Sequence, residues 1–204
     1  MEKTRIKKLA SLSYFTRRDI KLPLINSKGE ALMLVDIVIK AVSQLIERDN
    51  KIIERKLKEE CINHRLALYI QGNLPICLSW VMVDVEYDKN YDKPKEIEGS
   101  NGEKYKIRPD ILVHKREDNY NNMIAIECKK RHLNKLDKIK LKKLLEPPYS
   151  YKLSLGISYQ PKKKYFLFYV PMQNNFKIFH FDKFKKEIKE GLDAIRKSTH
   201  DYRI

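Results

Sequence analysis

Apolar residues recur at helical spacing near the beginning of the chain. The stretch 30–48 carries Leu32, Val35, Ile39, Val42 and Ile46. Because residues three and four apart share a helix face, this spacing predicts a helix over 30–48. A second helix is predicted over 50–71, and Gly72 and Pro75 end it. Residues 1–29 are basic and turn-like near their end, so we expect an irregular arm there.

The middle of the chain changes to the two-residue spacing of β-strands. Residues 78–87 alternate, with Val81, Val83 and Val85 on one face. This pattern predicts a strand, and the polar residues 88–103 that follow it predict a loop.

Two further apolar stretches flank a polar connection. Residues 105–113 and 122–129 are typical of strands, and residues 114–122 between them are polar and rich in Asn. Asn and Asp favour turns, so the pattern predicts two antiparallel strands joined as a hairpin.

The last third of the chain returns to a helix and then alternates again. A helix is predicted over 132–146, ending at Pro147-Pro148. Strands are predicted at 150–159, 164–170 and 176–181, and a last helix at 182–198. The order of helix, three strands, helix and strand predicts an α/β fold with a mixed sheet in three layers. The C-terminal strands and helix are additions to that core.

The predicted hairpin carries two carboxylates and a lysine. Sixteen residues separate Asp110 from Glu127, and Lys129 lies two beyond Glu127. Alternate strand residues share a face, so Glu127 and Lys129 point the same way and Cys128 points into the core. Two adjacent carboxylates form a hard oxygen site suited to Mg²⁺ or Mn²⁺. A neighbouring lysine can stabilise developing negative charge, and this set of groups suits phosphodiester cleavage.

The net charge adds a preferred class of partner. The chain has 43 Lys and Arg against 27 Asp and Glu, a net charge of +16. The segment from Cys128 to Ile204 holds 20 basic and 7 acidic residues, or +13, which leaves +3 for residues 1–127. A basic surface around an acidic site suits a polyanion, although a lysine-rich proteome would also make an ordinary domain basic.

Cysteine usage and hydropathy favour a cytoplasmic protein without a membrane partner. Cys61, Cys77 and Cys128 are odd in number and far apart, which argues against a disulfide framework or structural zinc. The first residues lack the apolar stretch of a signal peptide, and the apolar segment 31–42 is too short to span a membrane. Six glycines form no phosphate-cradling loop, so a nucleotide cofactor is not expected.

The spacing of the acidic residues and the lysine also matches a known signature. Pro109-Asp110, followed after sixteen residues by Glu127-Cys128-Lys129, resembles the motif of the PD-(D/E)xK nuclease superfamily. The resemblance implies that Asp110 and Glu127 bind the metal, joined by the backbone carbonyl of Cys128. It implies that Lys129 assists the attacking water and that the product carries a 5′-phosphate.

The resemblance extends to the order of elements. The superfamily has a restriction-endonuclease-like αβββαβ core, and the predicted elements match it from about residue 50 to 160. We therefore divide the chain into an N-terminal arm and helix at 1–49 and a nuclease-like domain at 50–204.

A further carboxylate is expected from the helix before the first strand. The segment Glu59-Glu60 to His64-Arg65-Leu66-Ala67 resembles a Glu…His-Arg-Leu-Ala helix of uncharacterised bacterial and phage members. Glu59 is the predicted inward acid and Glu60 is the alternative, because successive helix positions are about 100° apart and only one can face the site. A solvated face with a Glu60–His64 pair is the structural alternative.

Nucleic-acid contacts are predicted for Arg108 and for a basic run that opens the helix after the motif. The run consists of Lys130, Arg131, Lys135, Lys138 and Lys142. Such residues follow a phosphate backbone in nucleic-acid-binding proteins. The alternatives are a solvated charged face for the run and a carboxylate pair for Arg108.

Several other polar residues are weighed against structural roles. Asp84 and Glu86 share a predicted strand face and form either a second metal site or the wet face of an edge strand. Asp137 and Lys140 are expected to form a salt bridge that braces the site. His114, in the predicted hairpin, is a candidate for assisting there.

The sequence thus predicts a Mg²⁺- or Mn²⁺-dependent deoxyribonuclease, with RNA as the other polyanion to consider. One alternative is a catalytically inactive subunit that binds nucleic acid or serves assembly. Another is a basic domain with a chance motif, which would leave Asp110 and Glu127 far apart. No separate sequence-reading motif is present, so a homodimer or a partner subunit would supply specificity.

Overall fold

The computed structural model describes residues 27–99, 102–160 and 165–200, with side chains described over 30–99, 102–160 and 165–193. The predicted arm lies outside these residues up to residue 26. Among the described residues, the helices are too short or too polar to cross a bilayer.

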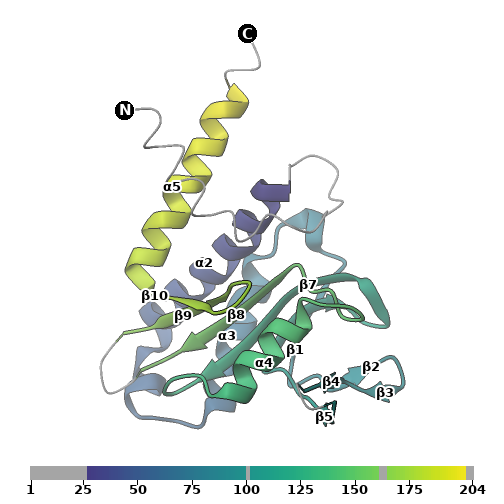
Figure 1. The fold of residues 1–204 in the computed structure, drawn as a ribbon. Coiled ribbons are helices and arrows are strands. Elements are labelled where there is room, and N and C mark those ends of the chain that lie inside the picture. Colours follow the sequence, from purple (N-terminus) through teal and green to yellow (C-terminus); the bar gives the residue numbers. More distant parts are fainter. Residues whose placement is uncertain (1–26, 100–101, 161–164, 201–204) are drawn as a thin grey trace.

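A mixed six-stranded sheet forms the centre of the molecule (Figure 1), with strand order β1-β6-β7-β8-β9-β10. β7 and β8 are parallel, and all other neighbours in this sheet are antiparallel. The predicted α/β class with a mixed sheet is therefore confirmed. The strands span Met82–Val85 (β1), Ile111–Lys115 (β6), Asp118–Lys129 (β7), Leu153–Ser158 (β8), Leu167–Pro171 (β9) and Phe176–His180 (β10).

Helices cover both faces of this sheet and make three layers (Figure 1). Helices α2 (Ser27–Glu54), α3 (Glu59–Asn73) and α5 (Phe181–His200) share one apolar core with one face of the sheet. Helix α4 (Lys135–Leu144) covers the other face, where it packs on the sheet through Leu141 and Leu144.

Alternation along the central strands produces these two cores. Ile124, Ile126 and Cys128 point toward α2 and α3, whereas Ala125 faces the α4 side. Every strand residue from Asn122 to Cys128 is buried, as expected for a strand with layers on both faces. Burial of each large apolar side chain contributes about 1.5–3 kcal/mol to folding.

Helix α4 starts at a capping box, which fixes the direction of its first turn. The Asn134 side chain accepts a hydrogen bond from the Asp137 backbone N–H at 2.9 Å. The Asn134 N–H in turn donates to Asp137 Oδ2 at 3.0 Å. A cap of this kind stabilises a helix by about 0.5–2 kcal/mol. Asp137 is thereby held on the sheet-facing side, where its side chain is buried.

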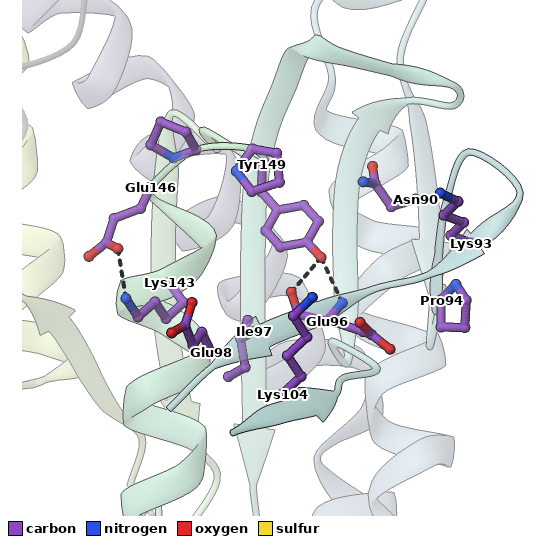
Figure 2. A pocket seen from close by; sticks show the side chains of 12 residues that line it. Asn90, Lys93, Pro94, Glu96, Ile97, Glu98, Lys104, Lys143, Glu146 and Tyr149 are labelled. Carbon is purple, nitrogen blue, oxygen red and sulfur yellow. Dashed lines mark hydrogen bonds and ion pairs between the residues drawn. The ribbon is translucent and has the colours of Figure 1, made fainter. Parts of the chain in front are cut away.

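The connection between β1 and β6 is an elaborated insert. It contains two small antiparallel sheets, one of β2 and β3 and one of β4 and β5. The Tyr149 hydroxyl holds the insert against the body, because it accepts from the Glu96 N–H and donates to the Glu96 carbonyl, both at 2.7 Å (Figure 2). Beside it lies a hollow of about 450 Å³. The insert strands are Lys89–Asn90 (β2), Lys93–Pro94 (β3), Glu96–Glu98 (β4) and Lys104–Lys106 (β5).

Three predicted strand boundaries are wrong. Strand 78–87 begins only at Met82, because a 3-10 turn at Ile76–Leu78 (η2) precedes it. It ends at Val85, since Glu86 has a left-handed backbone with φ of 52°. The predicted strand 105–113 is two strands in different sheets, β5 and β6, and the predicted loop 88–103 contains β2, β3 and β4.

The predicted hairpin connection is shorter than expected. β6 continues to Lys115 and β7 begins at Asp118, so most of the polar stretch 114–122 is strand. Asn122 is buried there because its amide donates to the Tyr149 carbonyl at 2.6 Å. A polar residue is tolerated inside a sheet when its hydrogen bonds are satisfied in this way.

The boundary between the first two helices is also displaced. Helix α2 continues to Glu54 with a kink at Asp49, where φ is −123°. The Asp49 carboxylate accepts hydrogen bonds from Arg65 Nε and from the Tyr69 hydroxyl, both at 2.7 Å. These contacts join α2 to α3. The other predicted helices and strands agree with the structure apart from their ends.

Gly156 lets α4 approach the sheet beside Glu127, its register partner in β7. A Cβ atom at Gly156 would lie 2.3 Å from Leu133 Cδ2 and 3.0 Å from Tyr169 Cβ. Gly156→Ala is therefore expected to lower the free energy of unfolding by about 1–3 kcal/mol, measured by urea denaturation. The control is Gly72→Ala in α3, where a Cβ has nothing within 4 Å. Equal stability of wild type and Gly156→Ala would contradict this packing.

Candidate active site

The first two carboxylates meet where β6 begins and β7 ends. Ile111 of β6 pairs with Ile126 of β7, so Asp110 lies beside Glu127. The Cys128 N–H donates to Asp110 Oδ2 at 2.6 Å. The structure therefore brings together two residues that are separated in sequence, whereas the chance-motif alternative predicted that they would lie far apart. The Cys128 side chain is buried in the core, as predicted.

Glu127 is fully buried, yet only one of its carboxylate oxygens has a partner. Oε2 accepts from Lys140 Nζ at 2.6 Å, whereas Oε1 has no hydrogen bond among the described residues. Burial, followed by the negative charge of Asp110, raises the pKa of Glu127 to about 8. A buried carboxylate oxygen without a donor is costly, so this atom is poised to accept a cation or a proton.

In Asp110, as in Glu127, one carboxylate oxygen accepts a hydrogen bond from the protein. Burial raises its pKa, although the Cys128 N–H and the charges of Lys129 and Lys140 oppose that rise. Its Oδ2 accepts the Cys128 N–H, so its other oxygen is the one left for a ligand. Asp110 and Glu127 can therefore each offer one oxygen without losing a protein contact.

Lys129 lies between carboxylates from two helices. Its Nζ is 3.9 Å from Glu59 Oε2 of α3 and 3.8 Å from Asp137 Oδ1 of α4. Burial by itself would lower the pKa of Lys129, but the neighbouring carboxylates, Asp110 foremost, outweigh it and raise the pKa. Lys129 is thus an ammonium ion at neutral pH, suited to stabilising anionic oxygen rather than to accepting a proton.

Glu59 reaches the end of β7 from the first turn of α3. Its Oε1 accepts a hydrogen bond from the Lys130 N–H at 2.6 Å. Glu60, the alternative inward acid, is exposed. Helix α3 is held at this position by a buried contact, because the Tyr159 hydroxyl donates to Asn63 Oδ1 at 2.7 Å. Of the two acids, Glu59 is therefore the one in contact with the strand that carries the motif.

A hollow of about 350 Å³ opens above these groups. One wall comes from α3, a second from α4 and a third from the insert that precedes β6. Glu127 does not line this hollow; it is fully buried, and its Oε2 pairs with the lining residue Lys140. The lining residues are Glu59, Glu60, Asn63, Glu86, Lys106, Ile107, Arg108, Asp110, Lys129, Leu136 and Lys140.

Asp84 and Glu86 do not form a joint site. Asp84 accepts from His114 Nε2 at 3.0 Å and forms a bidentate pair with Arg116 at 2.9 and 2.5 Å. These contacts overcome burial and hold the Asp84 pKa well below its ordinary value. Glu86 turns away because its backbone is left-handed, and it lies 3.3 Å from Arg108. A shared second metal site is therefore wrong for this pair.

His114 does not assist at the hollow. It lies on β6 opposite Met82, at the end of the strand away from Asp110, and its ring is buried against Asp84. Its role is structural, in fixing β1 to β6. The predicted connection at 114–122 would have brought His114 toward the site, but His114 lies in strand β6.

The residues predicted to contact nucleic acid do not gather along one face of the hollow. Among them, only Arg108 lines the hollow. The Lys138 ammonium lies over the Tyr169 ring at 5.8 Å from its centroid, and that of Lys142 lies over Phe176 at 5.6 Å. Lys130 Nζ donates to the Lys56 carbonyl at 3.2 Å, and Arg131 and Lys135 are exposed.

Lys140 is the site residue whose main contact the sequence did not predict. The expected salt bridge to Asp137 is present at 3.6 Å, but the contact with Glu127 is shorter, at 2.6 Å. Helical phase is the signal that places Lys140 there. It lies three residues after Asp137 and beside Leu141, and both of those residues are buried against the sheet.

Fold and site together define an α/β protein with an acidic and lysine-bearing hollow at the end of an internal strand. No family model, curated protein or solved structure matches the chain. Among the described residues, no group of three or more His, Cys, Asp or Glu side chains is placed to hold a metal ion.

The raised pKa of Glu127 predicts a pH dependence of stability. Between its ordinary value of 4.5 and about 8, the folded protein keeps a proton that the unfolded chain releases. The contribution of Glu127 to the free energy of unfolding therefore falls as pH rises through this window. We expect urea denaturation in EDTA to show the stability of Glu127→Gln relative to wild type increasing from pH 5 to 8. A stability difference between Glu127→Gln and wild type that does not change with pH would contradict the raised pKa of Glu127.

Proposed function

We propose that this protein is a metal-dependent nuclease of the PD-(D/E)xK type that hydrolyses phosphodiester bonds, most plausibly in DNA. The observation that carries the proposal is the convergence of Glu59, Asp110 and Lys129 on one hollow, with the buried carboxylate of Glu127 next to Asp110. These groups come from α3, the start of β6 and β7, and the contacts of Asp110 and Glu59 with the end of β7 bring them together.

The order of elements around the hollow supports the same proposal. The sequence α3, β1, β6, β7, α4, β8 follows the αβββαβ order of a restriction-endonuclease-like core. β1, β6 and β7 form an antiparallel meander, and α4 then returns the chain to β8, parallel to β7. The remaining strands β9 and β10 and helix α5 extend this core at one edge.

The residues at the hollow fit a magnesium or manganese ion. Mg²⁺ is usually held by one or two carboxylates together with waters and substrate phosphates, rather than by a complete protein cage. Asp110 and Glu127 would supply those carboxylates, each through its unengaged oxygen, and the Cys128 carbonyl would join them. The Glu127 Oε1 atom, which is buried and has no hydrogen-bond partner among the described residues, would be satisfied by such a cation.

When bound, the ion would polarise a phosphoryl oxygen and lower the pKa of an attacking water. The chain's own residues do the rest. Lys129, an ammonium held between Glu59 and Asp137, stabilises the charge that develops on phosphoryl oxygens and positions the water. Lys106 and Arg108 line the same hollow and suit contacts to flanking phosphates.

The charge of the chain supports a nucleic-acid substrate. The chain carries a net charge of +16, and its hollow is lined by both carboxylates and basic side chains, which suits a polyanion handled through a bound cation. DNA is the proposed substrate and RNA the alternative. A homodimer or a partner subunit remains the proposed source of sequence preference, and a cytoplasmic location fits the same activity.

One observation favours a second candidate, an inactive nucleic-acid-binding or assembly subunit. The Glu127 carboxylate is already paired with the Lys140 ammonium at 2.6 Å, so a protein cation occupies one of its oxygens. In this alternative, Lys140 would neutralise the site permanently. The presence of Asp110, Glu127 and Lys129 together favours the enzyme.

Cleavage of supercoiled plasmid and of labelled single-stranded DNA and RNA tests the proposal. The protein is incubated with EDTA, Ca²⁺, Mg²⁺ or Mn²⁺, and the ends of any products are identified. Cleavage in Mg²⁺ or Mn²⁺ that EDTA stops is the expected result. Salt-sensitive binding without cleavage in any of these ions would replace the enzyme with the binding subunit.

A further inference from the structure

Helix α4 directs two side chains of opposite charge toward β7, the strand that carries Glu127 and Lys129. On β7, Glu127 and Lys129 are two residues apart and share a face. On α4, Asp137 and Lys140 are three residues apart, and their side chains are directed toward the same strand end. Glu127 therefore faces the positively charged Lys140, and Lys129 faces the negatively charged Asp137.

The distances establish a crosswise pairing. Lys140 Nζ lies 2.6 Å from Glu127 Oε2, and Asp137 Oδ1 lies 3.8 Å from Lys129 Nζ. Lys140 also lies 3.6 Å from Asp137, which closes the chain of charges along the helix. Both supporting residues are largely buried, with side-chain exposures of 12% for Lys140 and 4% for Asp137. Ion pairs shielded in this way are geometrically restrained rather than loosely solvated.

The packing of α4 keeps this pairing in register. The capping box with Asn134 fixes Asp137 in the first turn. Gly156, opposite Glu127 in the sheet, has no Cβ, so Leu133 and Leu141 can press against β8. The helix is thereby brought close enough for Lys140 to reach Glu127.

We propose that Asp137 and Lys140 are positioning residues with separate duties, Lys140 for the metal ligand Glu127 and Asp137 for Lys129. This inference rests on the proposed function. Lys140 engages Oε2, which would fix the orientation of the ligand and leave Oε1 for the ion. Asp137 Oδ2 belongs to the cap and Oδ1 lies near both Lys129 and Lys140, so one side chain connects the start of α4 to the position of Lys129. Neither residue needs to touch the substrate.

The test separates metal binding from turnover in the full-length protein. Mn²⁺ binding without nucleic acid is measured by titration calorimetry, and kcat and KM are measured on DNA. The variants are Lys140→Met, Lys140→Arg and Asp137→Asn, whose amide oxygen can still accept the Asn134 N–H. Lys143→Met is the control, because Lys143 is on the same helix but pairs with the surface residue Glu146 at 3.1 Å.

The two duties predict different losses. Lys140→Met should weaken Mn²⁺ binding about 10- to 100-fold, the range for residues that orient metal ligands, and Lys140→Arg should recover part of it. Asp137→Asn should bind Mn²⁺ like wild type but lose about 10- to 100-fold in kcat, with KM unchanged. Lys143→Met should match wild type in both.

Three outcomes would overturn the inference. Wild-type Mn²⁺ affinity in Lys140→Met removes the first duty, and wild-type kcat in Asp137→Asn removes the second. An identical pattern of loss in both variants means one structural effect rather than two duties. If Lys140→Met does not fold, Lys140→Arg and Asp137→Asn decide the result. A wild-type protein that neither binds Mn²⁺ nor cleaves overturns the proposed nuclease itself, whereas an active wild type with unaffected variants overturns this inference alone.

Discussion

Glu127→Ala is expected to lower metal-dependent cleavage by on the order of 10³-fold, since a bound cation supplies several kcal/mol of transition-state stabilisation and each 1.36 kcal/mol is tenfold in rate. Glu127 is the carboxylate that has one oxygen on Lys140 and the other unpartnered. Loss of the Glu127 carboxylate is expected to weaken binding of the metal ion rather than binding of the substrate. The measurement is initial rate on plasmid DNA in Mg²⁺ or Mn²⁺, at saturating protein.

Two variants separate a lost metal ligand from a lost fold. Glu127→Gln keeps the size of the side chain and an oxygen that can accept from Lys140, so it should fold and still fail to cleave. Glu146→Ala removes an exposed carboxylate that pairs only with Lys143 among the described residues, and it should cleave like wild type. Cleavage that survives in both Glu127 variants would mean a contaminating nuclease and would leave the site without support.

Lys129→Met is expected to lower kcat by roughly 10²–10³-fold, the range for removing one preorganised donor to a developing oxyanion. Mn²⁺ affinity should change little, because the carboxylates closest to Lys129 Nζ are those of Glu59 and Asp137 rather than those of the proposed metal ligands. The pKa of Lys129 is raised by the surrounding carboxylates, so the residue acts as a cation over the whole pH range of the assay. Single-turnover cleavage and Mn²⁺ titration measure the two effects independently.

Lys130→Met is the matched control for Lys129→Met. It removes one positive charge from the next position of the chain, where Nζ donates to the surface carbonyl of Lys56. Its effect should be a modest, salt-dependent loss of DNA affinity. If Lys129→Met cleaves normally and Lys140→Met does not, then the reactive lysine is the one on helix α4.

The central part of the fold was predictable because it follows local rules. The β6 and β7 strands have alternating or continuous apolar positions, and the resulting pairing places Asp110 beside Glu127. The inward acid on α3 was expected from the resemblance, and helical phase allowed only one of Glu59 and Glu60 to face the site. These predictions depend on spacing within one element, which a sequence displays directly.

The errors concern residues whose conformation is decided by distant partners. Glu86 ends its strand in a left-handed conformation, and its backbone N–H is held by the Asp110 carbonyl at 3.1 Å. Asn122 lies in a strand because its amide has a buried acceptor on Tyr149, 27 residues away. A polar residue with a tertiary hydrogen bond looks the same in sequence as one in a loop.

Lys140 shows why the site was only partly predictable. Lys138, Lys140 and Lys142 stand in one run of lysines, and the sequence predicted phosphate contacts for Lys138 and Lys142 and a salt bridge to Asp137 for Lys140. The structure separates them by helical phase: Lys140 faces Glu127, whereas Lys138 and Lys142 lie over aromatic rings of β9 and the start of β10. Only the packing of α4 against the sheet decides which lysine is buried.

Two segments border the hollow, helix α4 between β7 and β8 and the insert between β1 and β6, and they differ in how far they can be replaced by other sequences. Parallel strands such as β7 and β8 need a long crossover, so α4 is indispensable to the sheet as well as to the site. β1 and β6 are antiparallel and need only a two-residue turn, yet the chain between them forms an insert that brings Lys106 and Arg108 to the hollow. Grafting a different loop there would change what the hollow accepts while the proposed metal ligands and the sheet stay intact. The insert is therefore the natural place to engineer a new substrate preference.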